Sequence, residues 1–353
     1  MTSASLLCFN KRTMIDTRFN LAPTMIGSMP HKDAAAACAV VAKYLTEIPS
    51  WPQLPKRAFT EDMTVQFSEG FPGMTAREDR AYVQRGLSFD TQIERLYTAY
   101  LGNDIDAFPV SPEYAAGLHE FFNLKKLKPL AVKGQVSGPL SFGLTLKDES
   151  HQSILHDDTL SDVAARLLRL KAAWEEKELR RISKNTIIFV DEPVMASYGS
   201  AFFTLSRERV RNLMEEVLGG IGGLRGIHCC GNTDWSVLLG TSAHIISFDT
   251  YNFAGSLALY PAEVKGLIER GGAIAWGIVP NTEDALLKES ISSLKDRLED
   301  AMAPFARNGV PFKQLKEQSL LTPSCGLAGL SEDGAERVLE MLAALSERMR
   351  GRS

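Results

Sequence analysis

Two thiols and one imidazole give this sequence its clearest capacity for metal chemistry. His228 and Cys230 lie two positions apart in RGIHCC, and Cys325 follows the apolar segment QSLLTP. Because side chains two apart on a β-strand share a face, His228 and Cys230 should point the same way and Cys229 the other way. Thiolate and imidazole ligands suit zinc, and three protein ligands leave one position for a substrate. A pair of buried core residues explains His228 and Cys230 alone equally well.

Other polar residues also follow strand-like segments. Asp191 ends TIIFVD before a Glu-Pro pair, Asp249 ends HIISFD, and Ser28 follows TMIG. If the fold is an α/β barrel, catalytic groups gather where its strands end. Asp191 is then predicted to hold a cationic substrate group, and Asp249 to be a fourth zinc ligand or a partner of His228. Helix capping is the alternative role for an aspartate in this position.

Three glycines and one long polar segment are predicted to lie close to the substrate. Gly27 occurs in TMIGSMP, and Gly134 and Gly138 occur in KGQVSGP. Glycine lets the backbone approach a ligand closely, although tight turns explain these positions equally well. The segment 56–80 is rich in Gly, Pro and charge and is too long for an ordinary βα turn. It is predicted to be an active-site loop after the second strand.

The elements that must position these residues alternate along the chain. Strands are predicted at 24–28, 50–55, 130–136, 186–191, 225–230, 244–249, 272–279 and 318–323. Helical periodicity occupies 33–48, a region around 78–101, 112–122, 160–183, 207–218, 261–270, 290–306 and 331–350. Such alternation indicates a parallel sheet covered by helices. We predict a single (β/α)₈ TIM barrel over residues 19–353 after an N-terminal arm, 1–18; a doubly wound open sheet is the alternative.

Composition narrows the class of protein. The 353 residues carry a formal net charge of -4, and no Lys/Arg-rich block marks a surface for nucleic acid or an anionic membrane. The first 19 residues contain no apolar run long enough for a secretory signal or a membrane span, so a cytoplasmic protein is expected. Five cysteines, an odd number, argue for metal, catalytic or core roles rather than a disulfide framework.

Six motifs in order resemble the catalytic domain of cobalamin-independent methionine synthase. They are TMIGSMP, EDM at 61–63, KGQVSGP, VDEP, GIHCCGNTDW and PSCGL, and they span residues 24–327. That family lies within the superfamily of uroporphyrinogen decarboxylase and corrinoid-linked zinc methyltransferases. The resemblance implies Zn²⁺ on His228, Cys230 and Cys325, with Asp249 where the family has a ligating glutamate. It also implies that Ser28 and Asp191 hold the backbone of homocysteine.

The departures from the family change the expected methyl donor. The 353 residues contain no counterpart of the extra barrel that helps the long enzymes bind folate, and 277–284 lacks the histidine that serves them as proton donor. A methyl-corrinoid, free or on a corrinoid protein, is therefore the expected donor. Arg57 stands where those enzymes have a glutamate for the substrate ammonium, so it is predicted to bind a substrate carboxylate or sulfonate.

The resemblance therefore implies a zinc-dependent S-methyltransferase acting on a small thiol, with homocysteine placed first. Coenzyme M or another mercapto acid is the alternative acceptor, since Arg57 could bind its acidic group. Decarboxylation of a porphyrinogen is a second alternative, but it needs no metal and would leave His228, Cys230 and Cys325 unexplained. A non-catalytic scaffold that binds a corrinoid protein is the third.

Overall fold

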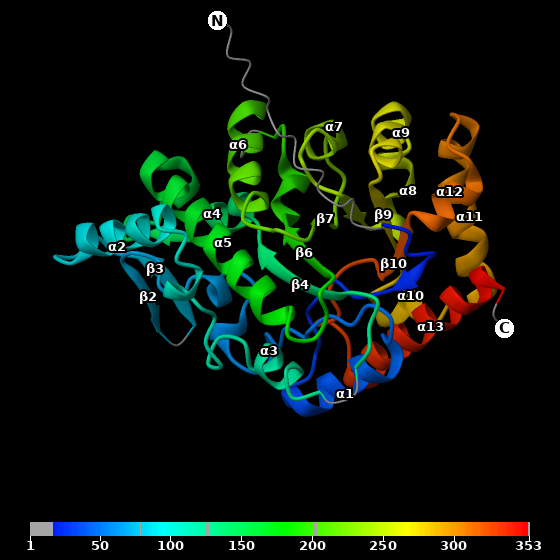
Figure 1. Ribbon diagram of the computed structural model, residues 1–353, viewed down its shortest axis with the longest axis horizontal. Coiled ribbons are helices and arrows are strands. Elements are labelled where there is room, and N and C mark those ends of the chain that lie inside the picture. The colour runs from blue at the N-terminus through cyan, green and yellow to red at the C-terminus, as the bar shows by residue number, and fades with distance from the viewer. Residues whose placement is uncertain (1–16, 78, 125–126, 201–202, 352–353) are drawn as a thin grey trace, which may run out of the picture.

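A curled parallel sheet of seven strands lies at the centre of the computed structural model (Figure 1), which describes residues 17–77, 79–124, 127–200 and 203–351. In spatial order the strands are β1 (Ala22–Pro23), β10 (Ser319–Pro323), β9 (Ala273–Val279), β8 (Ile245–Phe248), β7 (Leu224–Cys229), β6 (Thr186–Asp191) and β4 (Val132–Ser137). All neighbouring strands are parallel. The predicted α/β fold with a parallel sheet is confirmed.

The segment between the two edges of this sheet departs from the prediction. Residues 50–55 were expected to form a strand, but within them only single parallel bridges occur, Ser50 with Lys133 and Gln53 with Ser28. Proline cannot donate a backbone hydrogen bond, and Pro52 and Pro55 interrupt any continuous ladder here. The first strand is likewise displaced, since β1 ends at Pro23, before the predicted 24–28. The described sheet is thus a curled half-barrel.

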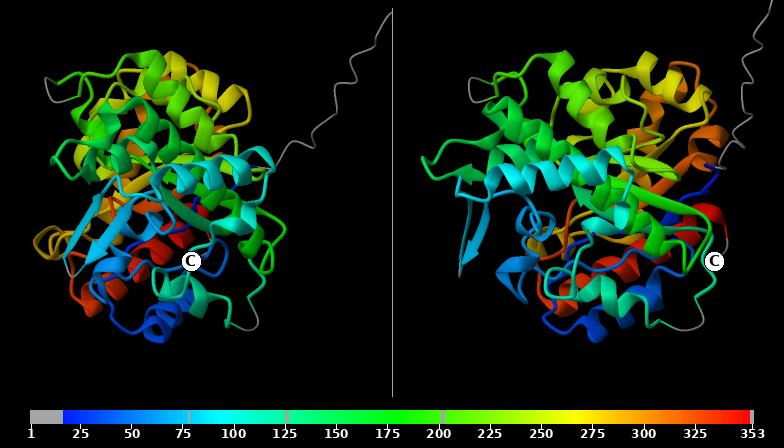
Figure 2. Two further views of the ribbon diagram at one scale, coloured as in Figure 1. Left: turned by 90° about the vertical axis from the view of Figure 1, so that its left-hand side faces the viewer. Right: turned by 60° about the vertical axis from the view of Figure 1, so that its left-hand side comes forward.

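Helices surround the outer face of the sheet (Figure 2). They are α1 (Ala34–Tyr44), α2 (Phe89–Leu101), α3 (Ala116–Phe121), α4 (Pro139–Thr145), α5 (Asp158–Leu179), α6 (Arg207–Leu218), α7 (Trp235–Leu239), α8 (Thr250–Leu257), α9 (Pro261–Glu269), α10 (Glu283–Leu286), α11 (Ile291–Arg307), α12 (Phe312–Glu317) and α13 (Glu332–Arg350). All eight helical segments expected from periodicity contain a helix, although 78–101 is helical only from Phe89. The short helices α4, α7, α8, α10 and α12 carry too few turns for their periodicity to be recognised.

The sheet separates two apolar cores. Its inner face buries a small cluster that includes Phe189, Leu224, Ala275 and Leu320, and its outer face packs against the helices in a much larger one. Strands buried on both faces explain the nearly continuous apolar sequence of β6, TIIFVD. The inner core fills the sheet below its carboxyl ends, so that only those ends offer room for a ligand.

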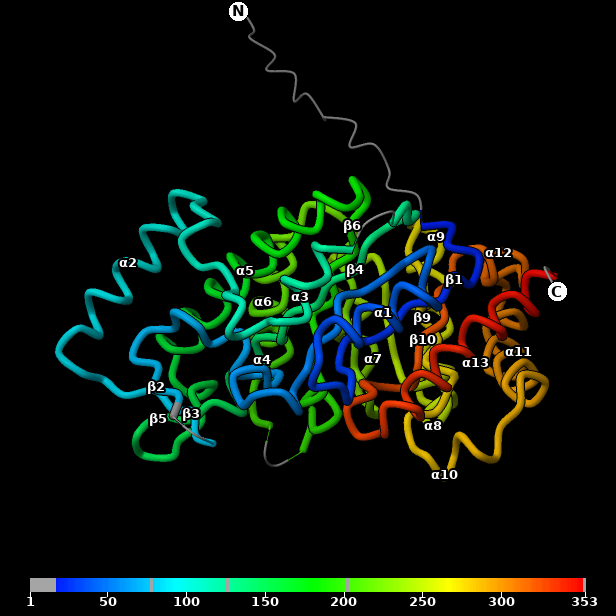
Figure 3. Tube along the Cα trace, turned by 90° about the horizontal axis from the view of Figure 1, so that it is seen from below, coloured from blue at the N-terminus to red at the C-terminus, as the bar shows by residue number. Residues whose placement is uncertain are grey.

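A small second sheet contains part of the long polar insertion. Strand β2 (Met74–Arg77) pairs with β3 (Arg80–Val83) in antiparallel fashion, and β3 pairs with β5 (Lys147–Asp148). This hairpin replaces the first part of the helix expected around 78–101, because its residues pair across a turn instead of following a helical period. The sheet and α2 project together to one side of the molecule (Figure 3).

Two predictions concern the N-terminal arm and the absence of a membrane span. The N-terminal arm, 1–18, lies almost wholly outside the described residues, which begin at 17. Among the described helices, none combines the length and the apolar character needed to cross a lipid bilayer.

Substitution of Gly117 in α3 tests the packing that holds segment 50–53 in place. A Cβ at this position would lie 1.8 Å from the backbone oxygen of Pro52, which cannot retreat without moving that segment. Gly117→Ala is expected to destabilise the protein by about 2 kcal/mol or more, as an overpacking substitution. The control is Gly266→Ala in α9, where nothing lies within 4 Å and helix propensity should stabilise by up to about 1 kcal/mol. Urea unfolding measures both; equal effects would contradict the packing argument.

Candidate metal centre

Four adjacent strands place one polar side chain each in a single row at their carboxyl ends. Ser137 of β4 pairs in register with Asp191 of β6, Asp191 with His228 of β7, and His228 with Ser247 of β8. Parallel partners in register point their side chains to the same face of a sheet. The row therefore faces the interior, above the apolar inner core. Gly226, two residues before His228, allows this packing, because a Cβ there would lie 2.1 Å from the ring of Phe189.

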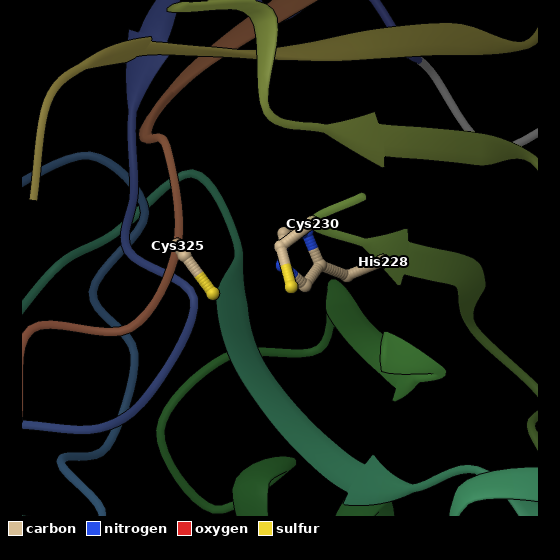
Figure 4. Close-up of side chains that lie close together, drawn as sticks. All are labelled: His228, Cys230 and Cys325. Atoms are coloured by element: carbon tan, nitrogen blue, oxygen red, sulfur yellow. The ribbon is translucent and has the colours of Figure 1, made fainter. Parts of the chain in front are cut away.

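His228 of this row comes together with Cys230 and Cys325. Their ligand atoms all lie within 4.8 Å of one another. Figure 4 shows the Cys325 side chain pointing from the loop after β10 toward the other two. The three residues line a cavity of about 220 Å³ together with Ser28 and Asp191. Cys229 instead is buried in the outer core, as strand alternation predicts.

The imidazole of His228 is held as a metal ligand requires. Its Nδ1 lies 3.0 Å from the hydroxyl of Ser247, while its Nε2 is buried and has no hydrogen-bond partner among the described residues. A metal-binding histidine commonly uses one ring nitrogen for the metal and fixes the other through a neighbouring polar group. An orphaned Nε2 beside two thiols matches the nitrogen and sulfur donors that zinc prefers, and three ligands leave an open position.

The two thiols interact strongly with each other. The hydrogen bond with Cys325 lowers the pKa of Cys230 well below its usual range; burial opposes this effect and His228 adds to it. The same hydrogen bond and burial raise the pKa of Cys325. A thiolate is therefore favoured at Cys230, which lies next to the imidazole, and the proton stays on Cys325. Thiolates rather than thiols are the metal-binding form.

The loop that carries Cys325 is fixed on both sides of the cysteine. Ser324 Oγ donates to Asn281 Oδ1 at 2.9 Å, and Asn281 Nδ2 donates to the carbonyl of Gly326 at 3.1 Å. The backbone N–H of Leu327 donates to the carbonyl of Ser28 at 2.8 Å. A register shift between β10 and β9 at residues 322–323 precedes these contacts. Such irregularities redirect side chains near functional sites.

Asp191 lies beside the cluster as a buried carboxyl with unused hydrogen-bonding capacity. Its Oδ1 is inaccessible to solvent and has no hydrogen-bond partner within residues 17–77, 79–124, 127–200 and 203–351. Burial raises the pKa of Asp191 to about 6, although His228 and Lys133 favour the charged form. Lys133 lies deeper in the interior, where its Nζ donates to the carbonyl of Ile26 at 2.6 Å. The free oxygen of Asp191 is therefore left for a ligand or solvent in the cavity.

Comparison with known proteins supports the predicted resemblance. No family model matches the chain. A methionine synthase from Methanocaldococcus jannaschii is 25% identical over 217 residues, which cover 60% of this chain and 63% of that protein, less than two thirds of its length. This chain is thus similar to a methionine synthase over part of its length. The resemblance predicted from the six sequence motifs is confirmed.

Two solved structures share the fold of this chain. A B12-independent methionine synthase from Shewanella sp. W3-18-1, in complex with selenomethionine, superposes with a TM-score of 0.55 at 15% identity, covering 94% of this chain and 98% of that one. A methyltransferase from Methanosarcina mazei gives a TM-score of 0.51 at 13% identity, covering 89% and 83%. At these identities the likeness extends to the fold alone.

Two further predicted site residues, Asp249 and Arg57, form hydrogen bonds with other residues of this chain. Asp249 caps the N-terminus of α8, where its carboxylate accepts from the N–H of Asn252 at 2.8 Å and from Asn252 Nδ2 at 2.7 Å. It is not part of the three-residue cluster. Arg57, expected to bind an acidic group of the substrate, instead donates to Glu61 Oε1 at 2.6 Å and does not line the cavity.

The three glycines predicted to lie against a ligand contact protein side chains instead. A Cβ on Gly134 would lie 1.8 Å from Glu175 Oε1, and one on Gly138 would lie 2.2 Å from the carboxyl group of Glu192. Beside Gly27 the space is taken by Gln53. None of the three lines the cavity. The close approach that glycine permits serves packing of the strand ends, which sequence cannot distinguish from ligand contact.

Sequence reasoning missed three residues that the structure places at the centre. Ser247, Glu61 and Asn281 contact or line the site, yet none belongs to a metal-binding or nucleophile pattern. Each had a usable signal: Glu61 opens the motif EDM, and Asn281 lies in 277–284, the segment without the family's histidine. Ser247 could have been found from its place on the strand after β7.

Replacing Asn281 tests whether it positions Cys325. In Asn281→Ala both hydrogen bonds that flank the cysteine are lost, so the affinity for Zn²⁺ should fall by roughly 10- to 100-fold, as for other residues that orient metal ligands. Competition with a chromophoric chelator measures that affinity. Asn308→Ala is the matched control: the Asn308 side chain donates to the carbonyl of Pro304 at the end of α11, so its loss should leave the affinity unchanged. Equal affinities in all three proteins would refute the role.

Proposed function

We propose that this chain is a zinc-dependent methyltransferase that moves a methyl group to the sulfur of a small thiol, with homocysteine as acceptor and methionine as product. The observation that carries the proposal is the buried, unpartnered Nε2 of His228 beside the thiols of Cys230 and Cys325. The methionine synthase and methyltransferase similarities support it.

The chemistry follows from the need for a thiolate nucleophile. Free thiols have pKa values of about 8.5, and zinc bound by these three residues would supply a Lewis acid that deprotonates an acceptor thiol in its open position. His228 is oriented by Ser247, and Cys325 is fixed by the contacts of its loop, so the protein holds its donors in place before substrate arrives. Asp191 offers a carboxylate to a cationic part of the acceptor.

The methyl donor is proposed to be a methyl-corrinoid, either free methylcobalamin or a corrinoid protein. Support comes from the segment 277–284, which offers no histidine as a proton donor; its Asn281 is instead bonded to the Cys325 loop. A cavity of about 220 Å³ has room for a small acceptor but not for a large donor. The donor must then approach from the open side of the cavity.

We propose further that residues 19–353 act as one catalytic domain, with segment 50–53 completing an eight-stranded barrel, and that the enzyme works in the cytoplasm. Two bridges from this segment support the proposed closure, one from Ser50 to Lys133 of β4 and one from Gln53 to Ser28, which follows β1 in the chain.

Zinc content tests the metal centre. Cys325→Ala and His228→Ala should each reduce bound zinc from about one ion per chain to a small fraction, because losing one of three ligands weakens binding greatly. Cys229→Ala is the control, because the Cys229 thiol faces the outer core and should be dispensable for zinc. Elemental analysis of purified, folded protein measures the content. Stoichiometric zinc in Cys325→Ala would contradict the assignment.

Competing thiols test the acceptor and the donor. With methylcobalamin as donor, homocysteine should be methylated at least about 10-fold faster than coenzyme M or another mercapto acid lacking an amino group. Loss of the methylcobalamin absorbance and mass spectrometry of the product measure the rates. Faster transfer to coenzyme M would replace the proposed acceptor, and transfer from a methylated folate but not from methylcobalamin would replace the proposed donor.

A further inference from the structure

Glu61 brings a second buried carboxylate to the cavity in front of the metal cluster. It ends the short 3₁₀ helix Phe59–Glu61, its side chain is 0% exposed, and it lines the cavity together with Asp191. Its Oε1 accepts from Arg57, whereas its Oε2 is buried and has no hydrogen-bond partner in the part of the chain that the structure describes. Buried carboxylate oxygens are normally satisfied, so an unpaired one beside a cavity points to a ligand that donates to it.

Arg57 supports Glu61 from outside the cavity. The guanidinium is 37% exposed and lies 2.6 Å from Glu61 Oε1. Burial raises the pKa of Glu61, and Arg57 opposes this shift together with the backbone of Leu54 and Ala116. If Arg57 turned to bind an acidic group of the substrate, it would leave Glu61 buried without its charge partner, which is costly. Arg57 is thus better suited to hold Glu61 than to bind substrate.

Asp191 and Glu61 together define what the cavity can bind. Each presents one unpaired, buried carboxylate oxygen, while the sulfur of an acceptor would lie near His228, Cys230 and Cys325. A cationic amino group donates up to three hydrogen bonds and could satisfy both acids. An acidic group placed there would meet like charge instead. The cavity therefore favours an aminothiol over a mercapto acid without an amino group.

We propose that Glu61, with Asp191, recognises a cationic amino group on the acceptor thiol, and that Arg57 is a positioning residue that holds Glu61 in place. The inference rests on the proposed function in taking a thiol as the ligand of the cluster. It assigns acceptor specificity to the EDM motif and reverses the role that the sequence suggested for Arg57.

Two thiols that differ only in the amino group test the proposal. Homocysteine and 4-mercaptobutanoate are titrated calorimetrically into the zinc-loaded protein. Wild type should bind homocysteine more tightly by roughly 10- to 100-fold, the range for hydrogen bonds to charged groups. Glu61→Gln should lose about 10-fold of this preference while its affinity for 4-mercaptobutanoate stays within about 3-fold of wild type. Glu61→Asp, which keeps the charge, should retain part of the preference.

Two further variants, Arg57→Gln and Glu113→Gln, complete the test. Arg57→Gln should reduce the preference by a smaller factor, because Glu61 remains but is no longer held. Glu113→Gln, an exposed glutamate in the next segment, should leave it unchanged. Thermal unfolding establishes that each variant is folded, and if Glu61→Gln is not, Arg57→Gln and Glu61→Asp carry the comparison.

Three results would overturn the proposal: no preference in wild type, equal weakening of both thiols in Glu61→Gln, or an unchanged preference in all folded variants. These outcomes are distinct from failure of the proposed function. Amino-group preference without methyl transfer would refute the reaction and leave the role of Glu61 standing. Transfer without that preference would do the reverse.

Discussion

In-register pairing of four parallel strands is the constraint on which the site depends. It fixes Ser137, Asp191, His228 and Ser247 at one height on one face of the sheet, because parallel partners share both direction and orientation. A slip of one residue in any strand would turn its polar group into the outer apolar core and replace it with Val136, Val190 or Ile227. The continuous burial of those apolar residues therefore enforces the register that aligns the polar row.

The row has an energetic cost that folding alone does not explain. His228 Nε2, Asp191 Oδ1 and Ser137 Oγ are buried without hydrogen-bond partners among the described residues. Each such atom costs about 1–3 kcal/mol relative to a satisfied one. Another buried acid is fully satisfied: Glu192 accepts three hydrogen bonds from Leu140 and Ser141. His228 Nε2 and Asp191 Oδ1 belong to residues that line one cavity, as expected of a site built for a metal and a polar ligand.

The charge distribution around the cavity gives these atoms different tasks. Cys230 lies next to His228, where a thiolate is favoured, and the carboxyl groups of Asp191, the in-register neighbour of His228, and Glu61 line the same cavity. Lys133 and Arg57 approach these acids from inside the sheet and from the surface, so each carboxylate has a basic group near it. The cavity thus combines donors for a metal and a sulfur with carboxylates for a cation.

The sequence by itself determined the parallel α/β fold and which residues end the strands, since continuous apolar runs and alternation are local properties. They sufficed to bring His228 and Cys230 to one face and to turn Cys229 away. The tertiary structure decided what local patterns do not encode. On β10 the inner face carries Leu320 and Thr322, so alternation alone would turn Cys325 away from the interior; the register shift and the bonds to Asn281 bring it to the cluster. Likewise, only the packed fold shows that Arg57 binds Glu61, because this contact depends on which way a loop side chain turns. It also shows that Glu175 and Glu192 fill the space beside Gly134 and Gly138, because these contacts join segments distant in sequence.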